Sequence, residues 1–220
     1  MPIPNTTLLS LIEDTAEQHL TTPDQHLTHA LANSAQHNLP SISITPLQGQ
    51  HLSLLAQLTH AQSVLEIGTL GGYSTIWFAK TGARVTSIEI DPKHRAVALE
   101  NLHHAGLDAN IVLGAALDVL PRLYEAGDRF DFVFVDADWG EQWEYFDWAA
   151  KLTRKGGAIY VDNVVQMMMG DGEDGVKSEG SLVVRAGKDE RVRATLVPTI
   201  SAHKNPGNAF IDGFLLAIVL

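Results

Sequence analysis

Asp131-Phe-Val-Phe-Val-Asp136-Ala-Asp138-Trp139 is the stretch that decides how this chain folds. An apolar run of strand-forming residues ends abruptly in two carboxylates. A run that is apolar on both faces is typical of a strand buried in the middle of a parallel sheet. Acids at its carboxyl end lie at the edge where open α/β sheets bind ligands. The pattern recurs at Gly157-Ala-Ile-Tyr-Val161, which Asp162-Asn163 follow. Two neighbouring strands that deliver oxygen ligands to one edge predict a site for a hard cation.

The same alternation of short apolar strands and amphipathic helices continues on both sides of this stretch. Strands are expected at 64–67, 84–90, 110–113, 130–135 and 158–161, with a helix after each of the first four. This rhythm predicts an α/β fold, with a parallel sheet and helices on both faces. Two closing strands, 193–200 and 210–220, lack a helix between them and predict an antiparallel hairpin at the sheet edge. Residues 166–181 are expected to form a polar, glycine-rich loop.

Three helices are expected before the first strand, at 6–20, 24–38 and 47–60, because apolar residues recur there at helical spacing. Thr22-Pro23-Asp24 predicts the start of the second helix, and Asp91-Pro92 predicts another helix start later in the chain. Residues 1–60 would then form a helical cap within a single domain that spans residues 1–220. Whether this cap shapes a pocket or an oligomer surface stays open.

Composition excludes several classes of protein. The net charge of −11 argues against a general nucleic-acid binder and against a protein of anionic membrane surfaces. No cysteine is present, which rules out disulfides and thiolate metal sites and is compatible with a cytoplasmic setting. The first residues lack the pattern of a signal peptide, and no apolar run approaches the about 20 residues of a membrane span.

A glycine-rich turn follows the first strand at Glu66-Ile-Gly68-Thr-Leu-Gly71-Gly72. Glycines at this place let the backbone turn tightly and approach a ligand closely. The spacing is neither that of the dinucleotide fingerprint nor that of a P-loop, so it favours a nucleoside cofactor without a pyrophosphate. Glu89, at the end of the second strand, is placed to accept hydrogen bonds from both hydroxyls of an adenosine ribose.

With these motifs the sequence resembles the cation-dependent S-adenosylmethionine O-methyltransferases, the family that includes catechol and caffeoyl-CoA O-methyltransferases. The resemblance covers roughly residues 45–165, with a weaker match at Ile211-Asp212-Gly213. The motifs that carry it are Gln48-Gly49-Gln50, Val64-Leu-Glu66-Ile-Gly68-Thr-Leu-Gly71-Gly72-Tyr73-Ser74, Ile88-Glu89, Val133-Phe-Val-Asp136-Ala-Asp138 and Val161-Asp162-Asn163. It implies a Rossmann-like methyltransferase fold with a seven-stranded sheet, and a homodimer. It also implies methyl transfer from S-adenosylmethionine to a hydroxyl of a vicinal-dihydroxy aromatic of the catechol, flavonoid or caffeoyl type.

Carried over residue by residue, the resemblance implies a cofactor site and a metal site. The expected cofactor contacts are Glu66, Gly68, Thr69, Ser74, Glu89, Ala116 and Asp138. Asp136, Asp162 and Asn163 are expected to hold a divalent cation, which makes Asp136 the catalytic residue. Oxygen ligands without a nearby His or Cys favour Mg²⁺ and leave Mn²⁺ or Ca²⁺ as alternatives. Trp139 and Asp212 are expected to contact the substrate.

One position departs from the family pattern. The family usually carries a lysine, thought to be the general base, three positions after the first metal-binding aspartate, and that position here is Trp139. Three interpretations stay open: the metal alone acidifies the hydroxyl, His203 or Lys204 supplies the base, or the substrate differs. Two rival functions follow, namely methyl transfer to nitrogen or to a lone hydroxyl, and S-adenosylmethionine binding without catalysis. Trp139 either forms an aromatic wall for a planar substrate or packs at the surface.

Overall fold

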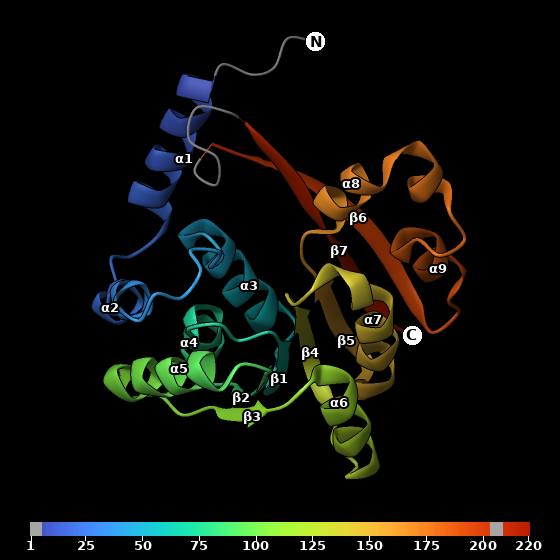
Figure 1. The fold of residues 1–220 in the computed structure, drawn as a ribbon, viewed down its shortest axis with the longest axis horizontal. Helices are drawn as coiled ribbons and strands as arrows, with labels where there is room; N and C mark the ends of the chain where they lie inside the picture. The colour runs from blue at the N-terminus through green and yellow to red at the C-terminus, as the bar shows by residue number, and fades with distance from the viewer. Residues whose placement is uncertain (1–5, 203–208) are drawn as a thin grey trace.

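One seven-stranded sheet organises the computed structural model, which describes residues 6–202 and 209–220 (Figure 1). The strand order is β3-β2-β1-β4-β5-β7-β6, and β7 runs antiparallel to both of its neighbours while the other strands are mutually parallel. The strands are β1 (Ser63–Ile67), β2 (Arg84–Glu89), β3 (Asn110–Leu113), β4 (Phe130–Val135), β5 (Thr153–Val161), β6 (Val192–Ser201) and β7 (Phe210–Val219). The expected parallel sheet with a C-terminal antiparallel hairpin is confirmed.

Helices cover both faces of this sheet (Figure 1). They are α1 (Thr6–Leu20), α2 (Gln25–Gln36), α3 (Pro46–Leu58), α4 (Tyr73–Ala79), α5 (Pro92–Ala105), α6 (Ala116–Glu125), α7 (Gln142–Leu152), α8 (Val164–Lys177) and α9 (Leu182–Lys188), with a 3₁₀ turn η1 (Trp139–Glu141). Phe132 and Phe134 of β4 enter the core under α2–α5, whereas Val133 and Val135 enter the core under α6–α9. This alternation explains why β4 is apolar from Phe132 to Val135: both of its faces are buried there.

Both predicted helix starts are confirmed by their caps. The carboxylate of Asp24 accepts hydrogen bonds from the amides of His26 and Leu27 at the start of α2. Asp91 does the same for Lys93 and His94 at the start of α5. These side chains satisfy backbone donors that the first turn of a helix leaves without intrahelical partners.

The expectation of a loop over residues 166–181 is wrong, because α8 occupies most of that segment. Val164 is fully buried and Met168 packs against the core under α6–α9, so apolar contacts stabilise a helix despite the glycines. The glycines still leave a mark. Gly172 has φ 68° and ψ −175°, a conformation outside the helical region that kinks α8 at this residue.

Asn101 fastens the N-terminal helices to the turn after β1. Its side chain is fully buried on α5. Nδ2 donates to the carbonyls of Gly71 at 2.9 Å and Ala30 at 3.3 Å, and Oδ1 accepts from Nδ2 of Asn33 at 2.9 Å. One amide group therefore joins α2 to the glycine turn, so the helical cap shapes the edge of the sheet where ligands are expected.

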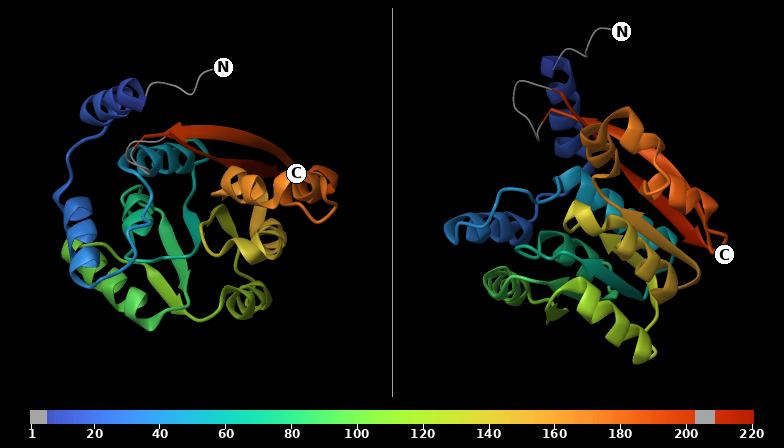
Figure 2. Two further views of the ribbon diagram at one scale, coloured as in Figure 1. Left: turned by 45° about the horizontal axis from the view of Figure 1, so that its top comes forward. Right: turned by 45° about the vertical axis from the view of Figure 1, so that its right-hand side comes forward.

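Helix α1 lies at the margin of the molecule, beside α3 and β6 (Figure 2). It buries no residue fully, and Leu8, Leu11, Ile12 and Leu20 are each more than half exposed. Within residues 6–202 and 209–220, none of the helices combines the length and the apolar character needed to span a bilayer.

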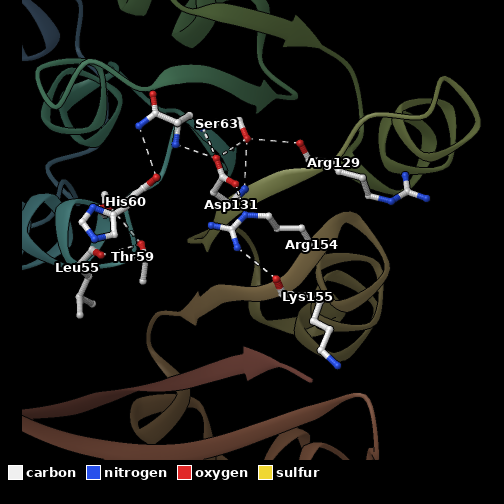
Figure 3. Close-up of polar contacts among 10 residues, drawn as sticks. Leu55, Thr59, His60, Ser63, Arg129, Asp131, Arg154 and Lys155 are labelled. Carbon is white, nitrogen blue, oxygen red and sulfur yellow. Dashed lines mark hydrogen bonds and ion pairs between the residues drawn. The ribbon is translucent and has the colours of Figure 1, made fainter.

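Asp131 ties together the opposite, amino-terminal ends of β1, β4 and β5 (Figure 3). Its Oδ2 accepts from the amides of Gln62 at 2.7 Å and Ser63 at 2.8 Å, and its Oδ1 pairs with Arg154. Burial acts to raise the pKa of Asp131, but the hydrogen bonds from Arg154, Gln62 and Ser63 outweigh it and hold the pKa below the usual 3.8.

Replacing this carboxylate by an amide, Asp131→Asn, is expected to lower the free energy of unfolding by about 1–3 kcal/mol at pH 7, because hydrogen bonds to a charged group are lost. Since the folded pKa lies below the unfolded value of 3.8, the stabilisation is present above pH 3.8 and disappears as the pH falls through the folded value. Urea unfolding at pH 7 and pH 3 measures both effects. Asp128→Asn, at an exposed position shortly before β4, is the control, and an equal change in both variants would contradict the assignment.

Candidate functional site

The predicted site residues stand in one row across the carboxyl ends of the parallel strands. Ile88, Ile67, Val135 and Val161 are register partners across β2, β1, β4 and β5. The next residues in the chain are Glu89, the last of β2, and Gly68, Asp136 and Asp162, which directly follow β1, β4 and β5. Three backbone hydrogen bonds continue the sheet into this row: Gly68 N to Ile88 O at 3.0 Å, Asp136 N to Ile67 O at 2.9 Å and Asp162 N to Val135 O at 2.9 Å. The two aspartates therefore occupy equivalent positions on adjacent strands.

The glycine turn lies against this row without space for a side chain. Gly68 has φ +96°, and a Cβ atom built on it would stand 2.0 Å from the carbonyl oxygen of Asp136. Leu70 also adopts a positive φ, 51°, which is uncommon for a residue with a side chain. Glu89 holds this conformation, because its Oε2 accepts from the amides of Thr69 at 3.2 Å and Leu70 at 2.7 Å. The acid predicted to meet the ribose thus also shapes the turn.

Glu66 is a carboxyl group with no solvent exposure. Its Oε2 accepts from Thr75 Oγ1 at 2.5 Å and Ser87 Oγ at 2.6 Å, and its Oε1 has no hydrogen-bond partner among the described residues. Burial raises the pKa of Glu66 from 4.5 to about 7, although the hydroxyls of Ser74, Ser87 and Thr75 oppose the shift. A buried acceptor without a donor is costly, so it suits a site completed by a ligand that carries N–H groups or positive charge.

Asp162 is bound from two helices. Gln48 Nε2 on α3 donates to its Oδ2 at 2.8 Å, and Gln142 Nε2 on α7 donates to its carbonyl oxygen at 2.9 Å. Burial raises the pKa of Tyr160, the residue two positions before Asp162, and the charges of Asp162, Asp136 and Asp212 raise it further. The charges of three carboxylates, which lie in or directly after β4, β5 and β7, therefore all act on one buried phenol.

Asn163 and Asp212 form the other half of this corner. Asn163 follows β5 with φ 58° and ψ 21°, a left-handed conformation that Asn tolerates better than most residues. Its Nδ2 donates to Oδ2 of Asp212 at 2.7 Å, and the amide of Gln166 donates to Oδ1 of Asp212 at 3.2 Å. Asp212 is only 5% exposed. Its predicted substrate contact stays a prediction, because the structure gives it Asn163 and Gln166 as partners.

The remaining predicted residues lie around the same edge. Ser74 is buried on α4, and Ala116 is half-buried at the start of α6. The carboxylate of Asp138 accepts from Tyr145 Oη at 2.6 Å, and Glu141 accepts from the same hydroxyl at 2.8 Å. Trp139 begins η1 and is 43% exposed. It directly follows Asp138, beyond the end of β4.

Sequence reasoning assigned no role to Gln48, Gln142 or Tyr145, although each holds a predicted site residue. Gln48 lies in one of the motifs that carried the family resemblance, which was the available signal. Within the described part of the chain, no group of three or more His, Cys, Asp or Glu side chains is arranged to hold a metal ion. The trio Asp136, Asp162 and Asn163 contains two such residues and an amide.

The raised pKa of Glu66 makes stability depend on pH. Because its pKa is about 7 in the folded chain against 4.5 as the ordinary value, the folded state favours the protonated form. Stability from this group is complete below pH 4.5 and falls by about 3 kcal/mol as the pH rises through 7. We expect Glu66→Gln without cofactor to lose this dependence and to be more stable than the native chain at pH 8.

Urea unfolding of both proteins between pH 4.5 and 8 checks this, with the difference between the two curves isolating Glu66. Glu125→Gln, at an exposed position on α6, is the control. A difference that stays constant over the whole range would show that Glu66 titrates at its ordinary value.

Known proteins are similar to this chain in fold and in sequence. The family model described as O-methyltransferase matches residues 17–201. A catechol O-methyltransferase of Mycobacterium tuberculosis is 42% identical over 205 residues, which cover 89% of each chain. A catechol O-methyltransferase of Niastella koreensis is 39% identical over 206 residues, covering 89% of this chain and 90% of that protein. The O-methyltransferase of Bacillus cereus, solved in complex with SAH, superposes with a TM-score of 0.86 at 35% identity, covering 98% of this chain and all of that one.

The family match spans most of the chain, and the relatives align over nearly their full length. The row of strand ends that carries the glycine turn, Glu89 and Asp138 lies where a nucleoside cofactor binds in sheets of this kind. The chain therefore belongs to the O-methyltransferase family, as an enzyme that uses S-adenosylmethionine.

Proposed function

We propose that this enzyme methylates one hydroxyl of a vicinal-dihydroxy aromatic and that Asp136, Asp162 and Asn163 hold a divalent cation, with Mg²⁺ the first candidate. The observation that carries the proposal is the placement of Asp136 and Asp162 at equivalent ends of adjacent strands. Asn163 directly follows Asp162 in the chain. The names of two relatives, both catechol O-methyltransferases, support the class of acceptor.

The residues present fit a hard cation. Two carboxylates and one amide supply oxygen donors, which Mg²⁺, Mn²⁺ and Ca²⁺ prefer. A cation bound there supplies Lewis-acid chemistry that lowers the pKa of a coordinated phenol. Asp136 and Asp162 supply negative charge that attracts the cation. The backbone carbonyl of Asp136 lies against Gly68 of the glycine turn. Acceptor and methyl donor are thereby held on neighbouring strands, which favours transfer by proximity.

The proposed cofactor contacts suit a cationic methyl donor. Glu66, Glu89 and Asp138 bring carboxylates to the end of the sheet where Gly68, Thr69, Ser74 and Ala116 also lie. The Oε1 of Glu66, without a protein partner in the described chain, is an acceptor for a group on that cofactor. Positive charge nearby stabilises the ionised form of Glu66 and so opposes the cost of its burial.

Trp139 replaces the family lysine and cannot accept a proton. Its exposed indole lies next to Asp138, so we assign it as an aromatic wall for a planar acceptor. The pKa of the phenol would be lowered by a bound cation, and its proton would then pass to water or to another side chain. His203 and Lys204, the predicted alternatives, lie outside the described residues.

We also propose that the enzyme is a homodimer that acts in the cytoplasm. Support for the dimer comes from α1, a helix that buries no residue fully and exposes more than half of Leu8, Leu11, Ile12 and Leu20. Light scattering coupled to gel filtration measures the mass of the assembly.

Removal of the cation is expected to abolish methylation. EDTA should stop methyl transfer to catechol and Mg²⁺ should restore it, because several kcal/mol of charge stabilisation depend on the metal. Asp162→Asn should reduce kcat/KM by about 100-fold or more. The matched control is Asp171→Asn, an exposed acid on α8.

A panel of catechol, monophenols and amines separates the rival functions. Turnover of monophenols or amines that is indifferent to EDTA would contradict the metal mechanism. S-Adenosylmethionine binding by calorimetry without turnover of any acceptor would favour a protein that binds the cofactor only.

The role of Trp139 is tested by truncation. Trp139→Ala should raise KM for catechol by about 2- to 12-fold with a smaller change in kcat, because an aromatic contact is worth about 0.5–1.5 kcal/mol. Trp139→Phe keeps a ring and should stay close to the native KM. Equal KM values for all three proteins would assign Trp139 to surface packing.

A further inference from the structure

We infer that Asp212 and Gln48 are positioning residues that fix which oxygens Asn163 and Asp162 present to the cation. The inference rests on the proposed cation site and adds to it a reason why these ligands are already oriented before metal binds. It assigns Asp212 a role through Asn163 instead of a contact with substrate.

The amide of Asn163 has two chemically different ends on one planar group. Only its oxygen can bind a cation, while its NH₂ group repels one. Nδ2 donates to Oδ2 of Asp212 at 2.7 Å, so the acceptor identifies the nitrogen end and leaves Oδ1 as the opposite end. Without Asp212, a half-turn about the last side-chain bond would exchange the two ends.

Asp212 is itself held in place. It is buried on β7, and its other oxygen accepts from the amide of Gln166 at the first turn of α8 at 3.2 Å. An ionised acceptor makes a stronger hydrogen bond than a neutral one and polarises the amide that donates to it. Asp212 therefore selects one orientation of Asn163 and increases the negative charge on the oxygen that remains.

Gln48 has the corresponding role for Asp162. Its Nε2 donates a hydrogen bond to Oδ2 of Asp162 at 2.8 Å, which fixes the rotation of the carboxylate. Gln142 holds the carbonyl of the same residue at 2.9 Å, so both the backbone and the side chain of Asp162 are restrained. Partners of this kind around metal ligands affect metal affinity by about 10- to 100-fold.

Binding of Mn²⁺ to the protein alone tests the inference without any turnover. The spin signal of free Mn²⁺, followed by electron paramagnetic resonance, gives Kd for the native chain, Asp212→Ala, Asp212→Asn and Gln48→Ala. We expect Kd to rise by about 10- to 100-fold for Asp212→Ala and Gln48→Ala, and by less for Asp212→Asn, whose oxygen can still accept from Asn163. Gln57→Ala on α3 and Asp108→Asn are exposed matched controls and should leave Kd unchanged.

A double-mutant cycle separates orientation from general charge or folding effects. A carboxylate presents an oxygen at both ends, so in an Asn163→Asp background the orientation no longer matters. Removal of Asp212 should then raise Kd by a smaller factor than it does beside Asn163. An equal factor in both backgrounds would overturn the role in orientation, even if Asp212 matters for stability.

The outcomes distinguish this inference from the proposed function. If the native chain binds no Mn²⁺, the cation site itself is wrong. If the native chain binds Mn²⁺ and Asp212→Asn, Asp212→Ala and Gln48→Ala bind it equally well, the cation site stands and the positioning role is wrong. Binding of SAH by each variant, measured by calorimetry, confirms that the fold around the cofactor edge is retained.

Discussion

The hydrogen bonds that continue the sheet one residue beyond its parallel strands are the constraint on which the site depends. The amides of Asp136 and Asp162 donate to the last residues of β1 and β4, and the amide of Gly68 donates to Ile88, the last residue but one of β2. Neighbouring strands lie about 4.8 Å apart, so this ladder sets the spacing of the glycine turn and the two aspartates before any side chain is placed. The absence of a side chain at Gly68 allows the carbonyl of Asp136 to approach the turn directly. Strand pairing therefore determines how far the cofactor edge lies from the acidic corner.

This backbone order explains why much of the fold was predictable from sequence. Strand β4 is apolar from Phe132 to Val135, where its residues enter both cores, and the acids Asp136 and Asp138 follow directly after it. Helix α8 was missed because glycine and acidic residues suggest a loop, whereas Val164 and Met168 gain enough burial to favour a helix. The sequence does not reveal this preference for a helix, because it depends on contacts with the folded core. Gly172 interrupts the helix with a kink.

The hydrogen-bond partners of the site residues could not be predicted from the sequence, for a related reason. Gln48 and Asp162 are 114 residues apart, and Asn163 and Asp212 are 49 apart. No local periodicity encodes such pairs, because α3 and β7 reach the site only after the sheet has assembled. Asp138 and Trp139 show the converse: their positions followed from the end of β4, but the hydrogen bond to Tyr145 depends on how η1 and α7 turn back.

Acids with low exposure gather at this edge in a chain that already carries a net charge of −11. Their mutual repulsion and the burial of Glu66 oppose folding when no ligand is present. Positive ligands that bind only the folded chain reverse that penalty and raise its apparent stability. The clustered acids therefore lower the stability of the enzyme without ligands, and their negative electrostatic potential attracts a cationic methyl donor.

The amide of Asn101 has a consequence for how such enzymes can be recombined. It joins the carbonyls of Ala30 and Gly71, so α2 and the turn after β1 share one buried group contributed by α5. A chimaera that takes its N-terminal helices from a relative would place a different backbone against the Asn101 amide. Because the same amide binds Gly71, the glycine turn would shift as well. The natural unit of exchange is therefore the N-terminal cap together with α5, although residues 37–100 separate α2 from Asn101 in the order of the chain.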